Sequence, residues 1–177
     1  TLPMIQIAFK APAYSDTAKD NVALDALATM AFSQTSAIYR KLVINEQRLD
    51  GLRAQVQQGV DPGLFTINAR VKKAEDLPAV RDEILATVKK FQDTLVAATD
   101  LERVKQRERY SFVMGLEDNE AIADEIARFI ALRRTPDTID KVYGLYSQLQ
   151  PQDLRDMARK YLVESNRTIV TLTGASK

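Results

Sequence analysis

Two stretches of alternating apolar and polar residues, separated by a short turn-forming loop, most restrict what this chain can fold into. Alternation with a period of two is typical of strands that bury one face. Residues 48–57 and 64–72 both alternate, and the Gly/Asp/Pro-rich segment 59–63 between them favours a turn. Two such strands around a short loop predict an antiparallel hairpin. Its apolar positions, expected to face the core, are Leu52, Ala54, Val56, Phe65, Ile67, Ala69 and Val71.

Further strands are predicted at the two ends of the sequence. Residues 4–11 alternate, with Ile5, Ile7 and Phe9 on one face. Residues 167–173 are rich in β-branched side chains, which favour strands.

The segments between these strands have the period of amphipathic helices. We expect helices over 16–32, from a Ser36 cap through 44, from 78 to 95, from a Thr99 or Asp100 cap toward 115, from 119, from a Thr135 cap followed by Pro136, and from 151. In the helix that starts at 119, the apolar residues expected to face inward are Ile122, Ile126, Phe129 and Ile130.

This order of elements predicts an α+β fold with a mostly antiparallel sheet and helices layered on one face. With 177 residues, of which 45% are hydrophobic, the chain is large enough for one core, and we expect a single domain over 1–177. The sheet is small for so many helices, so either a longer protein supplies further strands or the domain docks on a partner. Because the sequence begins in a strand-like run without a methionine, we expect it to be a piece of a longer protein.

The absence of histidine and cysteine excludes several classes of catalytic site. Without imidazole there is no Ser-His-Asp or Cys-His hydrolase, and no zinc site of the usual kinds. Glycine-rich phosphate loops and nucleophile elbows are also missing. We therefore assign no catalytic, cofactor-binding or metal-binding residue within this chain. The lack of cysteine does not distinguish periplasm from cytoplasm.

The charge balance and the hydropathy pattern bear on partners. The chain has 25 Lys and Arg against 24 Asp and Glu, so it lacks the basic excess of a nucleic-acid binder. Its apolar runs are too short to span a bilayer. We therefore expect neither nucleic-acid binding nor a membrane span.

Three polar clusters are interpreted as ordinary helix features. Residues 117–120 offer oxygens for a hard cation, but acids at a helix start also complement the macrodipole. Asp124, Glu125 and Arg128 suit ion pairs on a solvated face better than an acid/base pair. The basic run 105–109 is interrupted by an acid and favours an exposed helix face over a polyanion site. Five tyrosines are expected at the edge of the core: Tyr39, Tyr110, Tyr143, Tyr146 and Tyr161.

A sheet edge is the remaining candidate for binding, because an edge strand can pair with the backbone of an extended peptide. Either the hairpin or the first strand is expected to offer such an edge, unless the parent protein covers every edge.

Several stretches resemble one family of peptidases. Residues 33–43, Ser-Gln-Thr-Ser-Ala-Ile-Tyr-Arg-Lys-Leu-Val, resemble the small-x-x-Ser-x-Leu-Tyr-x-x-Leu-Val stretch of the second, non-catalytic half-domain of pitrilysin/insulinase-type zinc metallopeptidases, the inverzincins. The likeness continues in Ala-Pro-Ala at 11–13, in Asp-Pro-Gly-Leu-Phe at 61–65, and in an ending, 158–168, similar to A-x-x-Y-L followed by N-R-T. It covers nearly the whole chain in the expected order.

The resemblance implies a half-domain of the pitrilysin/processing-peptidase type. In that family, the active half carries an inverted H-x-x-E-H zinc motif and a distal Glu ligand. A second half of similar fold, without ligands, closes over it like a clamshell, and peptides bind in the chamber by extending a sheet edge. Zinc and its activated water are therefore expected in the catalytic half, which is missing from this chain.

One departure from the family pattern concerns two positions. Active relatives often place an Arg in an L-R-E step of this half and a Tyr seven residues later, both reaching toward the substrate at the zinc. The corresponding residues here are Val43 and Asp50, so no catalytic role is transferred to them. The parent either acts in a pair with another subunit or is a structural relative.

The sequence thus predicts the non-catalytic C-terminal domain of a zinc metalloendopeptidase, inactive alone, which helps to enclose and position peptide substrates. Its partners would be that peptide and a catalytic half-domain, in the same protein or in a partner subunit. The alternatives are a catalytically silent structural or assembly subunit of the same fold, and a small dimerisation or ligand-binding module. The separate domain is also expected to expose an apolar docking patch and to self-associate.

The missing imidazole and thiolate lead to a first prediction. The 177-residue chain should bind no stoichiometric zinc and show no peptidase activity, because it lacks the usual zinc ligands. Elemental analysis after dialysis and a peptidase assay check this. One tightly held zinc per chain would overturn the assignment.

Overall fold

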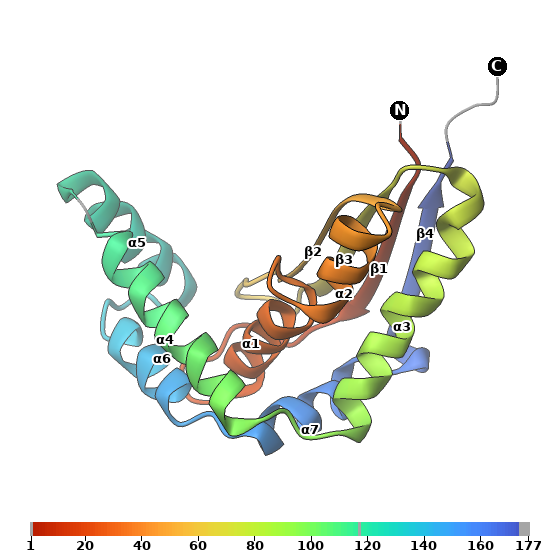
Figure 1. Cartoon of the computed structure of the whole chain (residues 1–177). Helices are drawn as coiled ribbons and strands as arrows, with labels where there is room; N and C mark the ends of the chain where they lie inside the picture. Colours follow the sequence, from red (N-terminus) through yellow and green to blue (C-terminus); the bar gives the residue numbers. More distant parts are fainter. Residues whose placement is uncertain (1, 117, 174–177) are drawn as a thin grey trace.

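The computed structural model describes residues 2–116 and 118–173, and it places the first strand at the centre of one antiparallel sheet. The strands are β1 (Met4–Lys10), β2 (Leu49–Val56), β3 (Leu64–Val71) and β4 (Arg167–Leu172), in the order β2-β3-β1-β4. β1 pairs with β3 on one side and with β4 on the other. The beginning and the end of the described chain therefore lie side by side in the sheet (Figure 1).

The alternation in the sequence becomes a one-sided core. Ile5, Ile7 and Phe9 of β1 are at most 1% exposed, and the apolar positions of β3 beside them are equally buried. The rings of Phe9 and Phe65 meet edge to face, with centroids 6.3 Å apart. The predicted hairpin and both terminal strands are thus confirmed.

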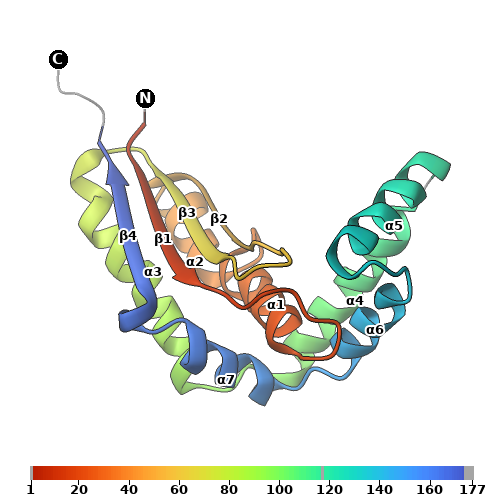
Figure 2. The same ribbon diagram turned by 180° about the vertical axis from the view of Figure 1, so that it is seen from behind.

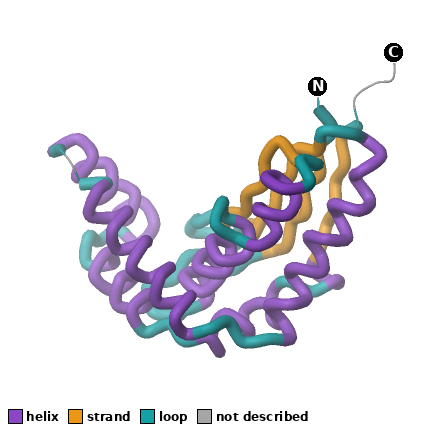
Figure 3. The backbone as a smooth tube through the Cα atoms, in the orientation of Figure 1, coloured by secondary structure: helices purple, strands orange, loops and turns teal. Residues whose placement is uncertain are grey.

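Three helical segments cover the apolar face of the sheet. They are α1 (Asp20–Phe32), α2 (Ala37–Tyr39) continued by a π-helical turn η1 (Arg40–Asn45), and α3 (Leu77–Asp93) (Figures 1 and 3). The last helix, α7 (Pro151–Tyr161), packs against α1 and α3 at the end of the sheet. α2 begins at Ser36, whose hydroxyl accepts a hydrogen bond from the Tyr39 N–H at 3.3 Å, as the sequence predicted. Single-turn 3-10 helices, η2 (Ala74–Asp76) and η3 (Glu164–Asn166), precede α3 and β4. The α+β fold with helices on one face is confirmed.

The remaining helices form an arm that projects from the sheet. We call α4 (Ala98–Met114), α5 (Asn119–Arg133) and α6 (Thr138–Ser147) the helical arm (Figure 2). The loop between β1 and α1 fastens it, because the Tyr14 hydroxyl lies 3.1 Å from Oγ1 of Thr138. In the same loop the buried Asp16 carboxylate lies 3.1 Å from Nε of Arg133 and 3.6 Å from Nζ of Lys141.

Several residues of the arm that were predicted to lie in the core are exposed. Phe129 is buried, but Ile122, Ile126 and Ile130 are between 36% and 41% exposed, so the prediction that they face inward is wrong. Their spacing correctly indicates one helix face, but this face lies on the projecting arm. Tyr110, also on the arm, is 65% exposed instead of lying at the core edge.

Several predicted helix boundaries are also wrong. α1 begins at Asp20 and not at 16, because the Ser15 hydroxyl accepts hydrogen bonds from the N–H groups of Thr17 and Ala18 and forms a turn. α4 begins after Ala97, without a side-chain cap. α6 begins at Thr138, because Pro136 lies in a turn. α3 ends at Asp93, short of the predicted 95.

The central position of β1 generates a stability prediction. Replacing Ile7 by Ala should lower the free energy of unfolding by about 3 kcal/mol, because it opens a cavity in a fully buried site. Urea unfolding measures this change. The control is Val170→Thr on β4, which keeps a β-branched residue at a site 56% exposed and should change stability by less than about 0.5 kcal/mol. Equal effects of the two substitutions would contradict the one-sided core.

Candidate functional site

The sheet has two edges, and neither is the first strand. Of the two alternatives that the sequence offered, β1 is paired on both sides and offers no edge, whereas the hairpin places its strand β2 at an edge. The edges are β2, from the predicted hairpin, and β4, from the end of the chain.

The register shows which groups of β2 face away from the sheet. The Gln57 N–H donates to the Leu64 carbonyl at 2.8 Å, and Val56 lies opposite Phe65. Because hydrogen-bonded and non-bonded pairs alternate in an antiparallel ladder, the backbone groups of Ala54 and Val56 point to the free edge. These N–H and C=O groups are available to another strand.

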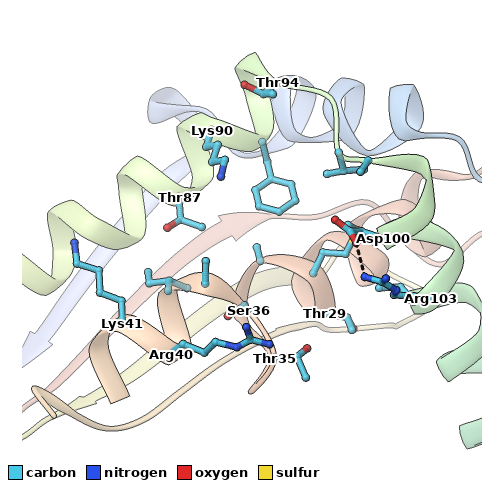
Figure 4. Close-up of a pocket in the computed structure, with 18 of the residues that line it drawn as sticks. Thr29, Thr35, Ser36, Arg40, Lys41, Thr87, Lys90, Thr94, Asp100 and Arg103 are labelled. Carbon is cyan, nitrogen blue, oxygen red and sulfur yellow. Dashed lines mark hydrogen bonds and ion pairs between the residues drawn. The ribbon is translucent and has the colours of Figure 1, made fainter. Parts of the chain in front are cut away.

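A first groove lies between α1, α2 and η1 on one side and α3 and α4 on the other. Its volume is about 900 Å³, and we call it the basic groove. Figure 4 shows Lys41 and Lys90 reaching into the space between α3 and the α2 segment. Apolar side chains of Met30, Phe91 and Val104 also line it. Its charged lining residues are Arg40, Lys41, Lys90, Arg103 and Arg107 with Glu83 and Asp100.

The positive charge of the basic groove is only partly neutralised. Lys41 pairs with Glu83, and Nη1 of Arg103 lies 3.0 Å from Oδ1 of Asp100. Within the described residues, Arg40, Lys90 and Arg107 take part in no ion pair, and all three are exposed. Three cations therefore face this groove without an acidic partner.

A second groove, of about 710 Å³, adjoins the free edge of β2. We call it the edge groove; residues 51–54 of β2 line it together with α1 and the neighbouring β3. Arg53 and Arg70 belong to its lining, and Arg70 lies 3.4 Å from the Asp50 carboxylate. Thr29 and Arg107 line both grooves, so the grooves meet there.

The two positions that depart from the family pattern serve local structure. Val43 lies in η1 and is half-buried against the core. Asp50 lies in the irregular pairing between Leu49 and Gly51, where its carboxylate pairs with Arg70. Between them the chain turns through Gln47 in the left-handed conformation, at φ 53°.

A cluster of acids and tyrosines lies where α1 meets the helical arm. The Tyr146 hydroxyl of α6 donates a hydrogen bond to Oδ2 of Asp25 on α1. Burial raises the pKa of Asp25, more than Tyr146 and Arg128 lower it. Burial and the neighbouring Asp25 likewise raise the pKa of Glu108 on α4. Sequence reasoning missed this cluster, because its members are far apart in the chain.

The other predicted clusters are helix features. Glu117 lies outside the described residues, and Asp118 caps α5 by accepting a hydrogen bond from the Ala121 N–H at 2.9 Å. Glu125 and Arg128 form the predicted ion pair, 2.5 Å between Oε1 and Nη2. The exposed-face interpretation of 105–109 is wrong for Lys105, whose ammonium is bound by Glu102 and the Ser147 carbonyl. Of the tyrosines, Tyr39, Tyr143, Tyr146 and Tyr161 are half-buried, as predicted.

The donor set does not fit zinc. The sequence has neither histidine nor cysteine, and residues 2–116 and 118–173 contain no group of three or more acidic side chains placed to hold a metal ion. In the same part of the chain no helix is both long and apolar enough to cross a membrane.

A family model described as the peptidase M16 inactive domain matches residues 1–108. The chain belongs to this family. The M16 inactive domain is thus an inactive C-terminal domain of zinc protease-like proteins, which confirms the family that the motifs at 33–43 and 61–65 indicated.

Known relatives of this M16 inactive domain agree with the assignment. The zinc protease PqqE of Helicobacter pylori is 23% identical over 172 residues, which are 97% of this chain and 38% of the relative. The crystal structure of a protease from Helicobacter pylori has a TM-score of 0.88 at 22% identity, over 98% of this chain and 41% of that one. The crystal structure of an inactive peptidase domain from Bordetella parapertussis has a TM-score of 0.84 at 22% identity, over 99% of this chain and 92% of that one. At these identities, the structures show the fold. The chain spans about two fifths of the two Helicobacter pylori proteins.

The half-buried Asp25, where α1 meets the helical arm, generates a pH prediction. Because its pKa is raised in the folded state, Asp25 binds a proton there more tightly than in the unfolded chain. Between the ordinary value of 3.8 and the raised value, stability therefore falls as the pH rises. Asp25→Asn, which still accepts the Tyr146 hydrogen bond, should raise the Tm at about pH 7 and flatten the decline of the Tm as the pH rises above the ordinary pKa of 3.8.

Thermal melts of both proteins across this pH range measure the difference. The control is Asp124→Asn, an exposed acid on α5 for which the pH dependence should match the wild type. A steeper decline in Asp25→Asn than in the wild type would contradict the assignment.

Proposed function

We propose that this chain forms a single non-catalytic domain of a zinc metallopeptidase, which encloses peptide substrates and positions them for a catalytic half-domain. The catalytic half, in the same protein or in a partner subunit, would hold the zinc and carry out the hydrolysis. The residues of this chain would bind the peptide, orient it and exclude water.

The observation that carries this proposal is the free edge of β2 beside the edge groove. Ala54 and Val56 direct their backbone groups outward, and residues 51–54 line the groove. An extended peptide can add to such an edge as a further strand, held by main-chain hydrogen bonds that accept many sequences. The groove beside the edge gives room for its side chains.

The membership of the chain in the M16 inactive-domain family supports the second part of the proposal. The two Helicobacter pylori relatives are more than twice as long as the part that this chain matches. The additional length is sufficient for a catalytic half of similar size. PqqE is named a zinc protease, and zinc needs ligands that the present chain lacks.

A silent assembly subunit is the second candidate, and the surroundings of Val43 and Asp50 favour it. Val43 packs against the core and Asp50 pairs with Arg70, so both side chains have a local structural role. In an assembly subunit the β2 edge would bind a permanent partner instead of a substrate.

The test is Ala54→Pro in the full-length protein that contains this chain. Proline removes an outward N–H and keeps the bonds to β3, so the sheet should remain intact while strand addition is blocked. We expect kcat/KM for peptides to fall at least tenfold, mainly through a higher KM, because binding is lost and the chemical step is not.

The matched control is Thr171→Pro on β4. Hydrogen-bonded pairs alternate there too, so the Thr171 N–H also points to a free edge, at the opposite side of the sheet. This variant should have a kcat/KM within about twofold of that of the unmodified protein. Unchanged kinetics in Ala54→Pro would reject the proposed function, and a full-length protein without any peptidase activity would favour the assembly subunit.

A further inference from the structure

The two grooves of this chain concentrate positive charge that its composition conceals. The whole sequence carries a net charge of only +1. Yet the lining of both grooves contains seven cations and two acids: Arg40, Lys41, Arg53, Arg70, Lys90, Arg103 and Arg107 with Glu83 and Asp100. A groove lined by one sign of charge attracts ligands of the opposite sign.

We propose that the basic groove and the edge groove together bind an acidic stretch of extended peptide. The inference rests on the proposed function, because it names the class of peptide that the β2 edge would hold. The peptide backbone pairs with β2 at Ala54 and Val56. Its carboxylates contact Arg107, at the junction of the grooves, and then Arg40 and Lys90.

The three unpaired cations that line the basic groove belong to separate elements. Arg40 comes from η1, Lys90 from the last turn of α3, and Arg107 from the middle of α4. Their place in one lining is a property of the tertiary fold and not of a charged run in the sequence. Within the described residues none has an ion-pair partner, so a ligand carboxylate would not have to displace an internal acid.

The lining of the grooves favours a peptide over a nucleic acid. The free backbone groups of β2 match a peptide main chain and have no equivalent in a nucleic acid. Single-stranded nucleic acids are usually held by aromatic side chains that stack on the bases. The aromatic residues in the two linings are Phe32, Tyr39 and Phe91; Phe32 is fully buried, and Tyr39 and Phe91 are half-buried and pack against the core.

The experiment uses the 177-residue chain and labelled peptides of equal length in which Glu, Gln or Lys alternates with Val. Fluorescence anisotropy should show the Glu peptide binding about tenfold more tightly than the Gln peptide, with the Lys peptide weakest. Added salt should weaken binding of the Glu peptide and have little effect on the Gln peptide.

Two triple variants localise the effect. Arg40→Gln/Lys90→Gln/Arg107→Gln should lower the affinity for the Glu peptide about tenfold, to that of the Gln peptide. The control, Lys10→Gln/Lys72→Gln/Arg109→Gln, removes the same charge from exposed sites outside both grooves and should stay within about twofold. Circular dichroism and thermal melts establish that both variants are folded.

The outcomes separate this inference from the proposed function. Equal binding of Glu and Gln peptides, both weakened by Ala54→Pro, would overturn the acidic specificity and leave the proposed function standing. Glu-specific binding in a full-length protein whose peptidase activity ignores Ala54→Pro would reject the proposed function and keep the acidic site. Failure of the Glu peptide to bind, or equally tight binding of a DNA oligonucleotide that the groove triple variant also abolishes, would overturn the inference.

Discussion

The pairing of β1 between β3 and β4 is the interaction on which the rest of the structure depends. It satisfies the hydrogen-bonding groups of the strand whose Ile5, Ile7 and Phe9 lie deepest in the core. It also joins the two ends of the described chain, because β4, the last strand, pairs with β1. All other elements lie between these two strands in the sequence. Because β1 and β3 are flanked on both sides, the free edges must be β2 and β4. The position of β2 as an edge, beside a groove, therefore follows from where β1 is placed.

The strands were predictable from the sequence because alternation reports which face of a strand is buried. Phe65, Ile67 and Val71 are buried as their spacing indicated. Alternation does not report which strands are neighbours, so it left the hairpin and β1 as alternatives for the free edge, and the strand order decides for β2 of the hairpin. The same limit applies to α5: the spacing of Ile122, Ile126 and Ile130 marks one face of a helix, but does not reveal that the helix belongs to a projecting arm. That information lies in contacts such as those of Asp16 with Arg133 and Lys141, which join distant segments.

The candidate site was less predictable than the fold, because its charged groups come from three separate helices. Residues 105–109 look like a charged helix face, and Arg109 is indeed exposed there. Arg107 differs from its neighbours only because α4 packs against α1 and brings it beside Thr29. Likewise, nothing in the sequence around Asp25 indicates its raised pKa, because the arm that covers it and supplies Tyr146 is distant in the sequence. A family motif identifies the domain, since it reflects the shared fold, but it does not report charges that differ from one member to another.

If the proposed function holds, binding energetics explain why a sheet edge and unpaired cations occur together. Ordering one peptide residue costs about 1–2 kcal/mol of conformational entropy, and each main-chain hydrogen bond contributes about 0.5–1.5 kcal/mol net. The net binding free energy of strand addition alone is therefore close to zero, and it depends little on the peptide sequence. In the proposed complex, charge contacts with Arg40, Lys90 and Arg107 would supply the additional binding free energy and make it depend on the peptide sequence. A domain without a reactive side chain can in this way select which peptides reach a catalytic centre, because selection requires binding energy and not chemistry.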